Sequence, residues 1–260
     1  MKVPRLAHPI VLVHGVMGYG RLHLGGSVLL SYWGNIPDVL TAAGNRVLVP
    51  RLPPAASVAV RAAELKDFLD REAPGERLHL IAHSMGGLDS RHAISRLGLA
   101  ERVLTLTTLG TPHRGTAFAD WGVRRVERLV KPVLTMLGLP HEAFRDLTTA
   151  GCCAFNEQTP DAPNVRYFSV AGKFSLDWTM LHWQLPYRII HALEGDNDGL
   201  VAVTSARWGE AFEVWDGDHA SLVNRSLTMT PAGRRWPDRI PQYAALLQRL
   251  EQSPGCNSGA

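Results

Sequence analysis

One five-residue segment, Ala82-His83-Ser84-Met85-Gly86, constrains the fold of this chain more than any other stretch. It follows an apolar run at 78–81 and precedes a helical pattern that extends from Gly87 to about Leu97. Between a strand and a helix, a serine with small residues two positions before and after it occupies a very sharp turn. Such a turn lifts the hydroxyl above the sheet, where a general base can reach it. The segment therefore predicts a strand–turn–helix unit with Ser84 as a nucleophile, and the alternative is an ordinary surface turn.

Residues 11–18 read Val-Leu-Val-His-Gly-Val-Met-Gly, the pattern of a buried strand followed by a glycine-containing loop. A serine that attacks a carbonyl group needs two backbone N–H groups aimed at the oxygen that becomes negative. One normally belongs to the residue after the nucleophile, here Met85, and the other to a loop after an early strand, where Val16 is well placed. The alternative is a strand with a flexible turn after it.

Two later segments rich in glycine and aspartate supply candidates for the acid and the base. In chains of this architecture the nucleophile, the acid and the base follow one another in the order Ser, Asp or Glu, His. Ser84, Asp198 and His219 satisfy that order. Three alternatives stay open. Asp198 is also a typical turn former, Asp196 is a rival for the acid, and His219 is one of eleven histidines.

Two further histidines lie close to these motifs. We expect His14 to brace the glycine-containing loop rather than to transfer protons. His83 lies directly before the predicted nucleophile, and its side chain should point away from Ser84, so we expect it to pack or to form the wall of a pocket. Neither histidine is therefore assigned a part in proton transfer.

Strand and helix patterns alternate along the chain. Buried strands are predicted at Ile10–Val13, Val47–Val49, Leu78–Ile81, Val103–Leu109 and Val165–Ala171, and a last strand is predicted at Phe212–Trp215. Leu65, Phe68 and Leu69 mark one face of a helix at about 60–72. This alternation implies an α/β fold with a mostly parallel sheet covered by helices on both faces. The 260 residues, 45% of them hydrophobic, are enough for one large domain that spans residues 1–260.

The segment 117–147 interrupts this alternation and is predicted to form a helical cap or lid inserted into the domain. Its apolar residues share one helical face, and Pro132 is expected to kink or interrupt the helix. The cap is either a mobile lid over Ser84 or a fixed structure packed on the core, and the short insertion slightly favours the fixed form. A second excursion, Phe174–Ile190, is rich in large apolar side chains that either line an acyl pocket or are buried in the cap.

Together these motifs resemble the bacterial true lipases and esterases, and the resemblance extends over most of the chain. Further segments that carry it are Tyr32–Leu40, Val47–Pro50, Leu109–Thr116 and Asn197–Val201. The stretch Thr-Pro-His-Arg-Gly-Thr is quite specific for lipases and their near relatives. The resemblance implies the α/β-hydrolase fold, with Ser84 as nucleophile, Asp198 as acid and His219 as base. It also implies that Val16 and Met85 supply the amides of the oxyanion hole.

The chain departs from this family at the calcium site that many members carry near the histidine loop. The family aspartate two residues after the catalytic histidine is Ser221 here. Asp177 matches the other calcium aspartate, but one carboxylate is a poor site for a cation that takes roughly six to eight oxygen ligands. Asp216 and Asp218 are either alternative ligands or solvated turn residues. We therefore expect no calcium site of the family pattern, no other metal and no cofactor.

Charge and cysteine content exclude several other classes. The formal net charge is +3 without a long Lys/Arg run, so we expect no nucleic-acid partner. The three cysteines make no disulfide framework, since Cys152 and Cys153 are adjacent and Cys256 lies in a Gly/Ser-rich tail. No apolar run approaches the length of a transmembrane helix. The first strand begins too early for a signal peptide, so the protein is expected to be intracellular or to have lost a leader.

These features predict a serine ester hydrolase that cleaves fatty acyl esters through an acyl-enzyme, with polyesters as secondary substrates. Its expected partners are small-molecule or lipid esters, with transient contact to a lipid interface. A thioesterase or acyltransferase with the same triad is the alternative, and rates on an ester, a thioester and an added alcohol acceptor separate these activities. A noncatalytic binding protein of the same fold usually lacks a triad residue, none of which is missing here, and fluorophosphonate labelling tests this alternative.

Overall fold

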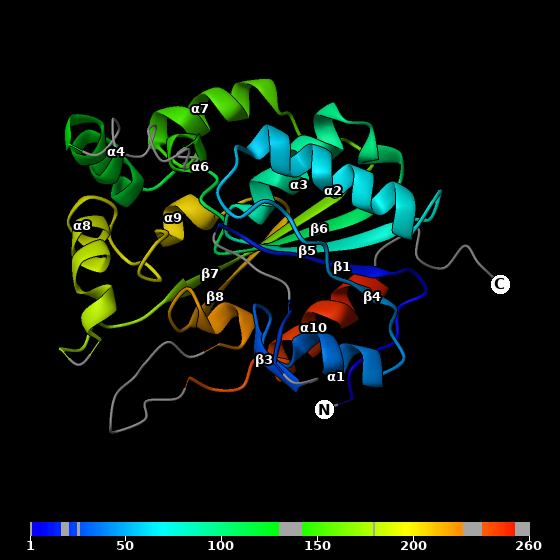
Figure 1. Ribbon diagram of the computed structural model, residues 1–260. Coiled ribbons are helices and arrows are strands. Elements are labelled where there is room, and N and C mark those ends of the chain that lie inside the picture. The colour runs from blue at the N-terminus through cyan, green and yellow to red at the C-terminus, as the bar shows by residue number, and fades with distance from the viewer. Residues whose placement is uncertain are drawn as a thin grey trace.

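The computed structural model is built around a parallel β-sheet (Figure 1). It describes residues 2–16, 21–24, 27–129, 142–178, 180–225 and 236–252. In these residues six parallel strands form one sheet in the order β4-β1-β5-β6-β7-β8. The strands are β1 (Ile10–Val13), β4 (Val47–Leu48), β5 (Leu78–His83), β6 (Val103–Leu109), β7 (Arg166–Lys173) and β8 (Ala211–Asp216). The predicted α/β class is confirmed, and β5 extends past its predicted end at Ile81 to include His83.

Helices and short 3-10 segments connect the strands. They are α1 (Ile36–Ala42), α2 (Val58–Glu72), α3 (Gly86–Arg96), η1 (Leu99–Glu101), α4 (Ala117–Leu129), α6 (Glu142–Asp146), α7 (Thr149–Gln158), η2 (Leu181–Trp183), α8 (Gln184–Glu194), α9 (Val203–Ala206), η3 (Ser221–Val223) and α10 (Ile240–Glu251). α2 begins before its predicted start because the Ser57 hydroxyl caps it by accepting the Val60 N–H. None of the described helices combines the length and the apolar character needed to cross a membrane.

The two faces of the sheet are covered by different helices, because neighbouring residues of a strand point to opposite sides. Ile10 and Leu12 of β1 pack in one core cluster with residues of α1 and α10. Val11 and Val13 pack in a second cluster with residues of α2 and α3. Figure 1 shows these two pairs of helices on opposite sides of the sheet. Every residue of β1, β5 and β6 is buried, as parallel strands covered on both faces require.

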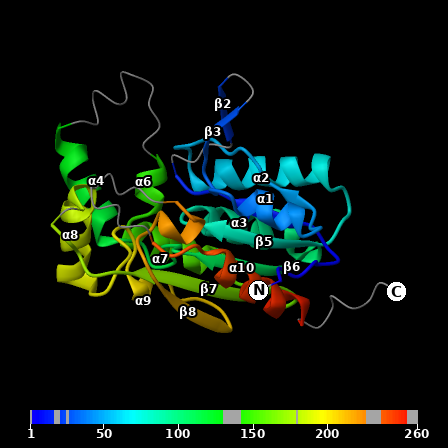
Figure 2. The ribbon, with the colours of Figure 1, turned by 90° about the horizontal axis from the view of Figure 1, so that it is seen from below.

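The predicted interruption at 117–147 contains α4 and α6, which with α7 form the long connection between β6 and β7. Residues 130–141, with the predicted break at Pro132, lie outside the described residues. α4 follows the carboxyl end of β6 and α8 follows the carboxyl end of β7. The two helices pack against each other, and Figures 1 and 2 both show them beyond the same end of the sheet.

A small antiparallel pair, β2 (Arg21–Leu24) and β3 (Ser27–Ser31), lies between β1 and α1 in the chain. The alternating pattern of strands and helices in the sequence does not predict this pair. Directly after β3 come Tyr32 and Trp33, both buried in the core cluster that contains α1 and α10. The pair therefore leads the aromatic segment into the core, where Tyr32 becomes part of the site described below.

Candidate active site

Ser84 lies on a sharp turn between β5 and α3, at the position that the sequence predicts. Its φ is +56°, a left-handed conformation that is strained for a residue with a β-carbon. Hydrogen bonds hold the turn on both sides. The Ser84 N–H donates to the Leu109 carbonyl at 2.9 Å, and the Thr111 hydroxyl donates to the Ser84 carbonyl at 2.7 Å. Strain maintained by its surroundings in this way is typical of functional sites.

The residues around Ser84 are small because backbone segments meet there. A β-carbon at Gly86 would lie 2.6 Å from the Val13 carbonyl oxygen, and one at Gly15 would lie 2.6 Å from the Ser84 β-carbon. Both distances are well below van der Waals contact, so a larger residue would push the turn and the loop apart. The loop after β1 therefore lies directly against the serine.

Asp198 and His219 form a buried pair. His219 Nδ1 lies 2.7 Å from Asp198 Oδ2, and the His219 backbone N–H donates to the Asp198 carbonyl at 2.8 Å. The other carboxylate oxygen, Oδ1, accepts the N–H groups of Leu200 and Val201 at 2.9 and 2.8 Å. Asp198 is thus both a turn former and the partner of His219. Because its carboxylate only accepts, Nδ1 carries the ring proton and Nε2 of the neutral imidazole has a free lone pair.

The rival acid, Asp196, faces solvent instead. Its side chain is 63% exposed, and its carboxylate lies 3.4 Å from the ammonium group of Lys173. An exposed ion pair of this kind contributes little to stability and holds a carboxylate only loosely. The structure therefore pairs His219 with Asp198 rather than with Asp196.

The nucleophile turn and the buried pair meet at the carboxyl end of β6. Leu109 accepts the Ser84 N–H, and the next residue, Gly110, touches the pair. Gly110 has a φ of +55°, and a β-carbon there would lie 2.9 Å from Asp198 Oδ2 and 3.1 Å from His219 Nδ1. Gly110 is not among the site residues predicted from the sequence. The sequence feature that could have identified it is its position between the buried strand at 103–109 and the Thr-Pro-His-Arg motif.

The two predicted oxyanion residues lie in one small apolar cluster. Met85 is fully buried between the turn and α3, and the partly buried Val16 packs in the same cluster with Leu88 and Ala143. The loop after β1 and the start of α3 are therefore neighbours, as a shared oxyanion hole requires. Residues 17–20, which complete the predicted loop, lie outside the described residues.

His14 occupies the bracing position expected of it. The Leu52 N–H donates to His14 Nε2 at 3.0 Å, so Nδ1 carries the proton and donates to the Gly15 carbonyl at 2.9 Å. Burial lowers the pKa of His14 to about 4, so the ring is neutral near pH 7. The ring therefore holds the peptide between Gly15 and Val16 in place without carrying charge.

A buried ion pair lies beneath the same loop. Arg61 of α2 and Asp89 of α3 are fully buried, with Nε 2.8 Å from Oδ2. Arg61 Nη2 donates to the His14 carbonyl at 2.7 Å, and Nη1 donates to the Pro53 carbonyl at 2.6 Å. Burial raises the pKa of Asp89 to about 7 against the opposing charge of Arg61. The guanidinium thus joins α2, α3 and the loop, a role that the apolar pattern of α2 did not indicate.

His83 has a more specific environment than packing or a pocket wall. It is buried, its Nδ1 lies 2.6 Å from the Tyr32 hydroxyl oxygen, and its Nε2 lies 3.0 Å from the His219 carbonyl oxygen. The expectation missed these bonds because both partners are distant in the sequence. The residue before the nucleophile therefore connects the aromatic segment to the histidine loop.

Protein groups hold the histidine loop that contains the candidate calcium ligands Asp216 and Asp218. Asp218 is fully buried, so the expectation of a solvated turn residue is wrong for it, while Asp216 is exposed. Asp218 accepts the Trp183 indole N–H at 3.0 Å and the Ser221 N–H at 2.8 Å. Arg239 donates to the Ser221 carbonyl and hydroxyl oxygens, both at 3.2 Å. Among the described residues, His, Cys, Asp and Glu side chains form no group of three or more suited to a metal ion.

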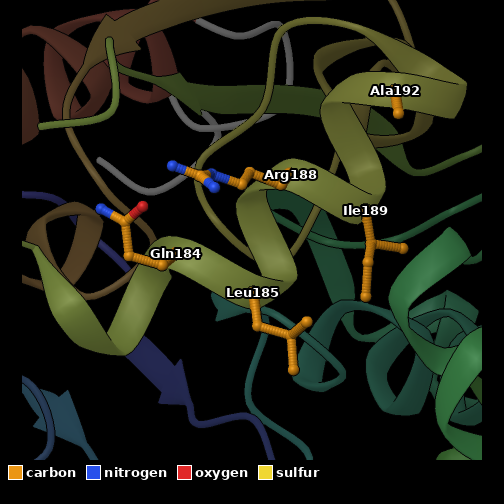
Figure 3. A pocket seen from close by; sticks show the side chains of 5 residues that line it. All are labelled: Gln184, Leu185, Arg188, Ile189 and Ala192. Carbon is orange, nitrogen blue, oxygen red and sulfur yellow. The ribbon is translucent and has the colours of Figure 1, made fainter. Parts of the chain in front are cut away.

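The second apolar excursion, Phe174–Ile190, is only partly buried. Met180 and Trp183 are buried, but Trp178 and Leu181 are 81% and 77% exposed. Trp178 and Leu181 are therefore not buried in the cap, and the alternative that this segment lines an acyl pocket stays a prediction. A shallow, open groove of about 490 Å³ runs along α8. Figure 3 shows the side chains that line it, Gln184, Leu185, Arg188, Ile189 and Ala192.

This combination defines a class of protein. A strained serine between a strand and a helix, followed in the chain by a buried aspartate–histidine pair at the same end of a parallel sheet, is the arrangement of the α/β-hydrolase enzymes. Residues 58–175 match the family described as "Putative serine esterase (DUF676)". That stretch contains the Ser84 turn and the end of β6, where the site assembles.

Comparisons with known proteins agree with the class. The chain is 35% identical to triacylglycerol lipase 2 of Saccharomyces cerevisiae over 84% of this chain and 80% of that protein. It is 27% identical to a triacylglycerol lipase of Vibrio cholerae, over 95% and 88% of the two chains. The chain therefore belongs to the lipase and serine esterase family, and the protein is a carboxylic ester hydrolase.

Solved structures give the same fold. The mature lipase BlEst2 of Bacillus licheniformis has a TM-score of 0.68 and 25% identity, over 92% of this chain and 91% of that one. The Staphylococcus hyicus lipase has a TM-score of 0.72 over 97% of both chains, and with 18% identity it shows the fold alone. Both confirm the predicted α/β-hydrolase architecture.

Proposed function

We propose that the protein hydrolyses fatty acyl esters through a covalent acyl-enzyme, with Ser84 as nucleophile, His219 as general base and Asp198 as the acid that orients it. The observation that carries the proposal is the buried His219–Asp198 pair at the strand end that also holds the strained serine turn. A carboxylate on Nδ1–H fixes the ring tautomer and leaves Nε2 with the lone pair that a general base needs.

The first half of the reaction acylates the serine. As the Ser84 oxygen attacks the ester carbonyl carbon, its proton passes to His219 Nε2, and Asp198 stabilises the imidazolium that forms. The carbonyl oxygen becomes an oxyanion and accepts the N–H groups of Val16 and Met85. When the carbonyl re-forms, the ester C–O bond breaks and the departing alcohol takes the proton from His219.

The second half releases the acid by the same route. Water replaces the alcohol, His219 Nε2 takes its proton, and the hydroxide attacks the acyl carbon. Collapse of this second intermediate breaks the bond to the Ser84 oxygen, which recovers its proton from His219. The N-terminus of α3 faces the turn, and its partial positive charge favours both oxyanions.

Contact with a lipid interface is supported by exposed apolar side chains on η2, on α8 and on the segment just before them. Trp178 and Leu181 are mostly exposed, as are Leu185 and Leu193 at 53% and 69%. Large exposed apolar groups in water mark a surface that meets an apolar partner, and tryptophan in particular favours the lipid–water boundary. We assign this surface transient contact with a lipid interface. The names of the curated relatives, triacylglycerol lipases, support a lipid ester as substrate.

The exposed apolar surface around η2 and α8 is connected directly to the loops that carry Asp198 and His219. Trp183, at the junction of η2 and α8, packs so closely on Gly199 that a β-carbon there would lie 2.7 Å from its ring. Its indole N–H holds Asp218, the residue before His219. Contact of α8 with a lipid surface therefore brings the acid and the base loops close to that surface.

We assign the whole chain to one hydrolase domain, with residues 117–147 as its cap. The described start of the cap is tied to the core, since Thr116 donates to the Leu200 carbonyl at 2.7 Å and the Ala117 N–H donates to Glu194 at 2.6 Å. These bonds join α4 to the acid loop and the end of α8, and they favour a fixed cap. For a fixed cap, the rate on a partly soluble ester saturates smoothly. A steep rise at the solubility limit would identify a mobile lid.

The test of the proposal compares the wild type with Ser84→Ala on p-nitrophenyl esters from acetyl to palmitoyl. Ser84→Ala is expected to fold normally and to lose roughly a thousandfold or more in turnover, because without the nucleophile only binding and oxyanion stabilisation remain. Near-normal hydrolysis by the folded variant would contradict the assignment. Short to medium acyl chains are expected to be the best soluble substrates.

Two further arms of the experiment address related activities. The same acyl group is offered as an ester, as a thioester and as an ester with an added alcohol acceptor. Faster reaction with the thioester would indicate a thioesterase, and transfer in preference to hydrolysis would indicate an acyltransferase. Fluorophosphonate labelling of the wild type but not of Ser84→Ala is expected, because the reagent requires an activated serine.

A further inference from the structure

His83 is buried between the nucleophile and the base but takes no part in the reaction steps above. It is the last residue of β5, directly before Ser84, and is 2% exposed. The centroid of its ring lies 4.4 Å from that of the His219 ring. A buried imidazole so close to a general base is either a second titrating group or a fixed support, and its hydrogen bonds distinguish the two.

The partners of the His83 ring define its tautomer. Nε2 lies 3.0 Å from the His219 carbonyl oxygen, which only accepts, so Nε2 carries the proton. Nδ1 then has the lone pair and accepts the Tyr32 hydroxyl at 2.6 Å. The Tyr32 oxygen in turn accepts the Gly15 N–H at 3.0 Å. One neutral arrangement therefore satisfies every hydrogen bond from Gly15 through Tyr32 and His83 to His219.

The charges around His83 keep it neutral. Burial lowers the pKa of His83 well below 6.5, and the positive charge of Arg225 opposes a proton there as well. Burial raises the pKa of Tyr32 to about 12, so the phenol keeps the proton that it donates. His83 thus cannot act as an alternative base near neutral pH. It remains a neutral donor when His219 becomes positive during the reaction.

We propose that His83 is a positioning residue that fixes the backbone of His219 relative to the loop of Gly15 and Val16, across the Ser84 turn. The Nε2 proton of His83 binds the His219 carbonyl oxygen and so fixes the backbone that carries the imidazole of the base. Its lone pair, through Tyr32, anchors the N–H of Gly15. The peptide that carries the Val16 N–H is held on its other side by His14. The chain of hydrogen bonds therefore fixes the positions of the base and of an oxyanion amide relative to each other.

This inference rests on the proposed function, because it takes His219 as the base and Val16 as an oxyanion donor. It predicts more than a packing role would. A phenylalanine keeps a flat aromatic ring at this position, although a larger one, but breaks both hydrogen bonds. A glutamine is smaller but offers an amide donor for the His219 carbonyl and an amide oxygen for the Tyr32 hydroxyl. If only packing matters, phenylalanine is the better replacement, and if positioning matters, glutamine is.

The test measures kcat, KM and the pH profile of kcat/KM on p-nitrophenyl butyrate for His83→Phe, His83→Gln and Tyr32→Phe. Rates are divided by the active fraction, titrated with a fluorophosphonate. The matched control is His79→Phe. His79 is also buried on β5, four residues earlier on the same face, and its Nδ1 contacts the Thr105 hydroxyl at 2.9 Å, away from the site.

His83→Phe is expected to lower kcat by roughly 10- to 100-fold, with KM within about threefold of the wild type. The acid limb of its pH profile should move, because the substitution removes a polar ring whose centroid lies 4.4 Å from that of the His219 ring. His83→Gln should recover most of kcat. His79→Phe should leave both kcat and the acid limb unchanged. A purely structural role would lower the active fraction without moving the acid limb.

Tyr32→Phe removes one oxygen from the same chain of bonds and is expected to lower kcat by roughly tenfold. Combined with His83→Phe it should lose less than the product of the two single effects, because both changes break one chain. The inference is overturned if kcat of His83→Phe stays within about twofold of the wild type, if its acid limb does not move, or if the two effects multiply. If His83→Phe does not fold, Tyr32→Phe decides alone, and an unchanged kcat overturns the inference.

Ser84→Ala, measured beside these variants, separates the two proposals. An active Ser84→Ala would show that the proposed function fails. An inactive Ser84→Ala with a fully active His83→Phe would show that the proposed function stands and that only the positioning role fails.

Discussion

Leu193 and Asp198 are separated by one short loop, yet their surroundings are opposite. Leu193, on the last turn of α8, is 69% exposed, and Trp178, before the helix, is 81% exposed. Asp198 is fully buried, and its carboxylate has three partners, His219, Leu200 and Val201. Polar groups are therefore held in the interior at the site, while large apolar groups are left in water just outside it.

The difference separates two properties of the enzyme. Polar groups that are already hydrogen-bonded need no reorganisation when charge develops, which favours turnover. Exposed apolar groups lower the free energy when they leave water for an apolar partner, which favours binding to insoluble substrate. Changes in the inner region should therefore alter turnover on every substrate. Changes on the outer surface should alter only the use of substrate at an interface.

The largest expected effect is that of Asp198→Asn in the inner region. The amide no longer fixes the tautomer and charge of His219, so turnover on a soluble ester should fall by roughly a thousandfold or more. Asp196→Asn makes the same substitution at an exposed neighbouring position, and its turnover should remain within about twofold of the wild type. Steady-state rates of both folded variants check this. A larger loss in Asp196→Asn would show that the acid is wrongly assigned.

The second prediction concerns stability rather than turnover and depends on two buried neutral histidines, His14 beside the site and His79 away from it. Burial lowers the pKa values of His14 and His79 to about 4, below the 6.5 of an exposed histidine. Between these values the unfolded chain binds more protons than the folded one, so the free energy of unfolding should fall as the pH drops. A shift of this size corresponds to about 3 kcal/mol for one histidine.

His79→Phe tests that dependence without touching the site. Urea unfolding of the variant and the wild type is compared at neutral pH and at about pH 5. At the lower pH the histidine is protonated in the unfolded chain but not in the folded one. The variant should lose less stability between the two conditions than the wild type does. Equal losses would show that His79 does not charge on unfolding.

The third prediction concerns the outer surface. Trp178→Ser combined with Leu181→Ser removes the most exposed apolar groups and should lower the rate on an emulsified long-chain ester by roughly tenfold. The rate on a soluble short ester should not change. Val60→Ser is the control, since Val60 is 47% exposed on α2, away from α8. An equal loss on both substrates would show that the surface acts through the site rather than through the interface.

The fold could be predicted from the sequence wherever local pattern and tertiary burial agree. Parallel strands covered on both faces are continuous apolar runs, so β1 and β6 have their predicted bounds. The β2–β3 pair was missed because it lies outside the alternating strand–helix pattern. Two adjacent glycines, as at 25–26, are a sequence signal typical of such a hairpin.

The site was predictable in its chemical residues and not in their supports. Chain order and turn chemistry are enough to select Ser84, Asp198 and His219. No short pattern reports that the Tyr32 hydroxyl reaches His83, 51 residues later in the chain. The Arg61–Asp89 pair joins two helices in the same way, across 28 residues. Long-range polar contacts depend on the packing of the fold, which local sequence does not encode.

The smallest expected effect is that of removing divalent cations. The loop before and after His219 is held by Trp183, Asp218 and Arg239, so its polar groups have protein partners. Ser221 stands where the family pattern has an aspartate, which lowers the negative charge available to a cation. EDTA should therefore leave turnover unchanged and shift Tm by less than about 1 °C.

Trp183→Phe shows, for comparison with EDTA, how much stability is lost when one side-chain hydrogen bond of the loop is removed. It leaves one oxygen of the buried Asp218 carboxylate without its indole donor and should lower the free energy of unfolding by about 1 to 3 kcal/mol. Thermal unfolding with and without EDTA, for both proteins, checks whether the loop is fastened by side chains or by an ion. A loss of stability in EDTA that calcium restores would show that another set of oxygens binds the ion. The inner region would then depend on a metal for part of its rigidity, and its contrast with the α8 surface would no longer be a property of the chain alone.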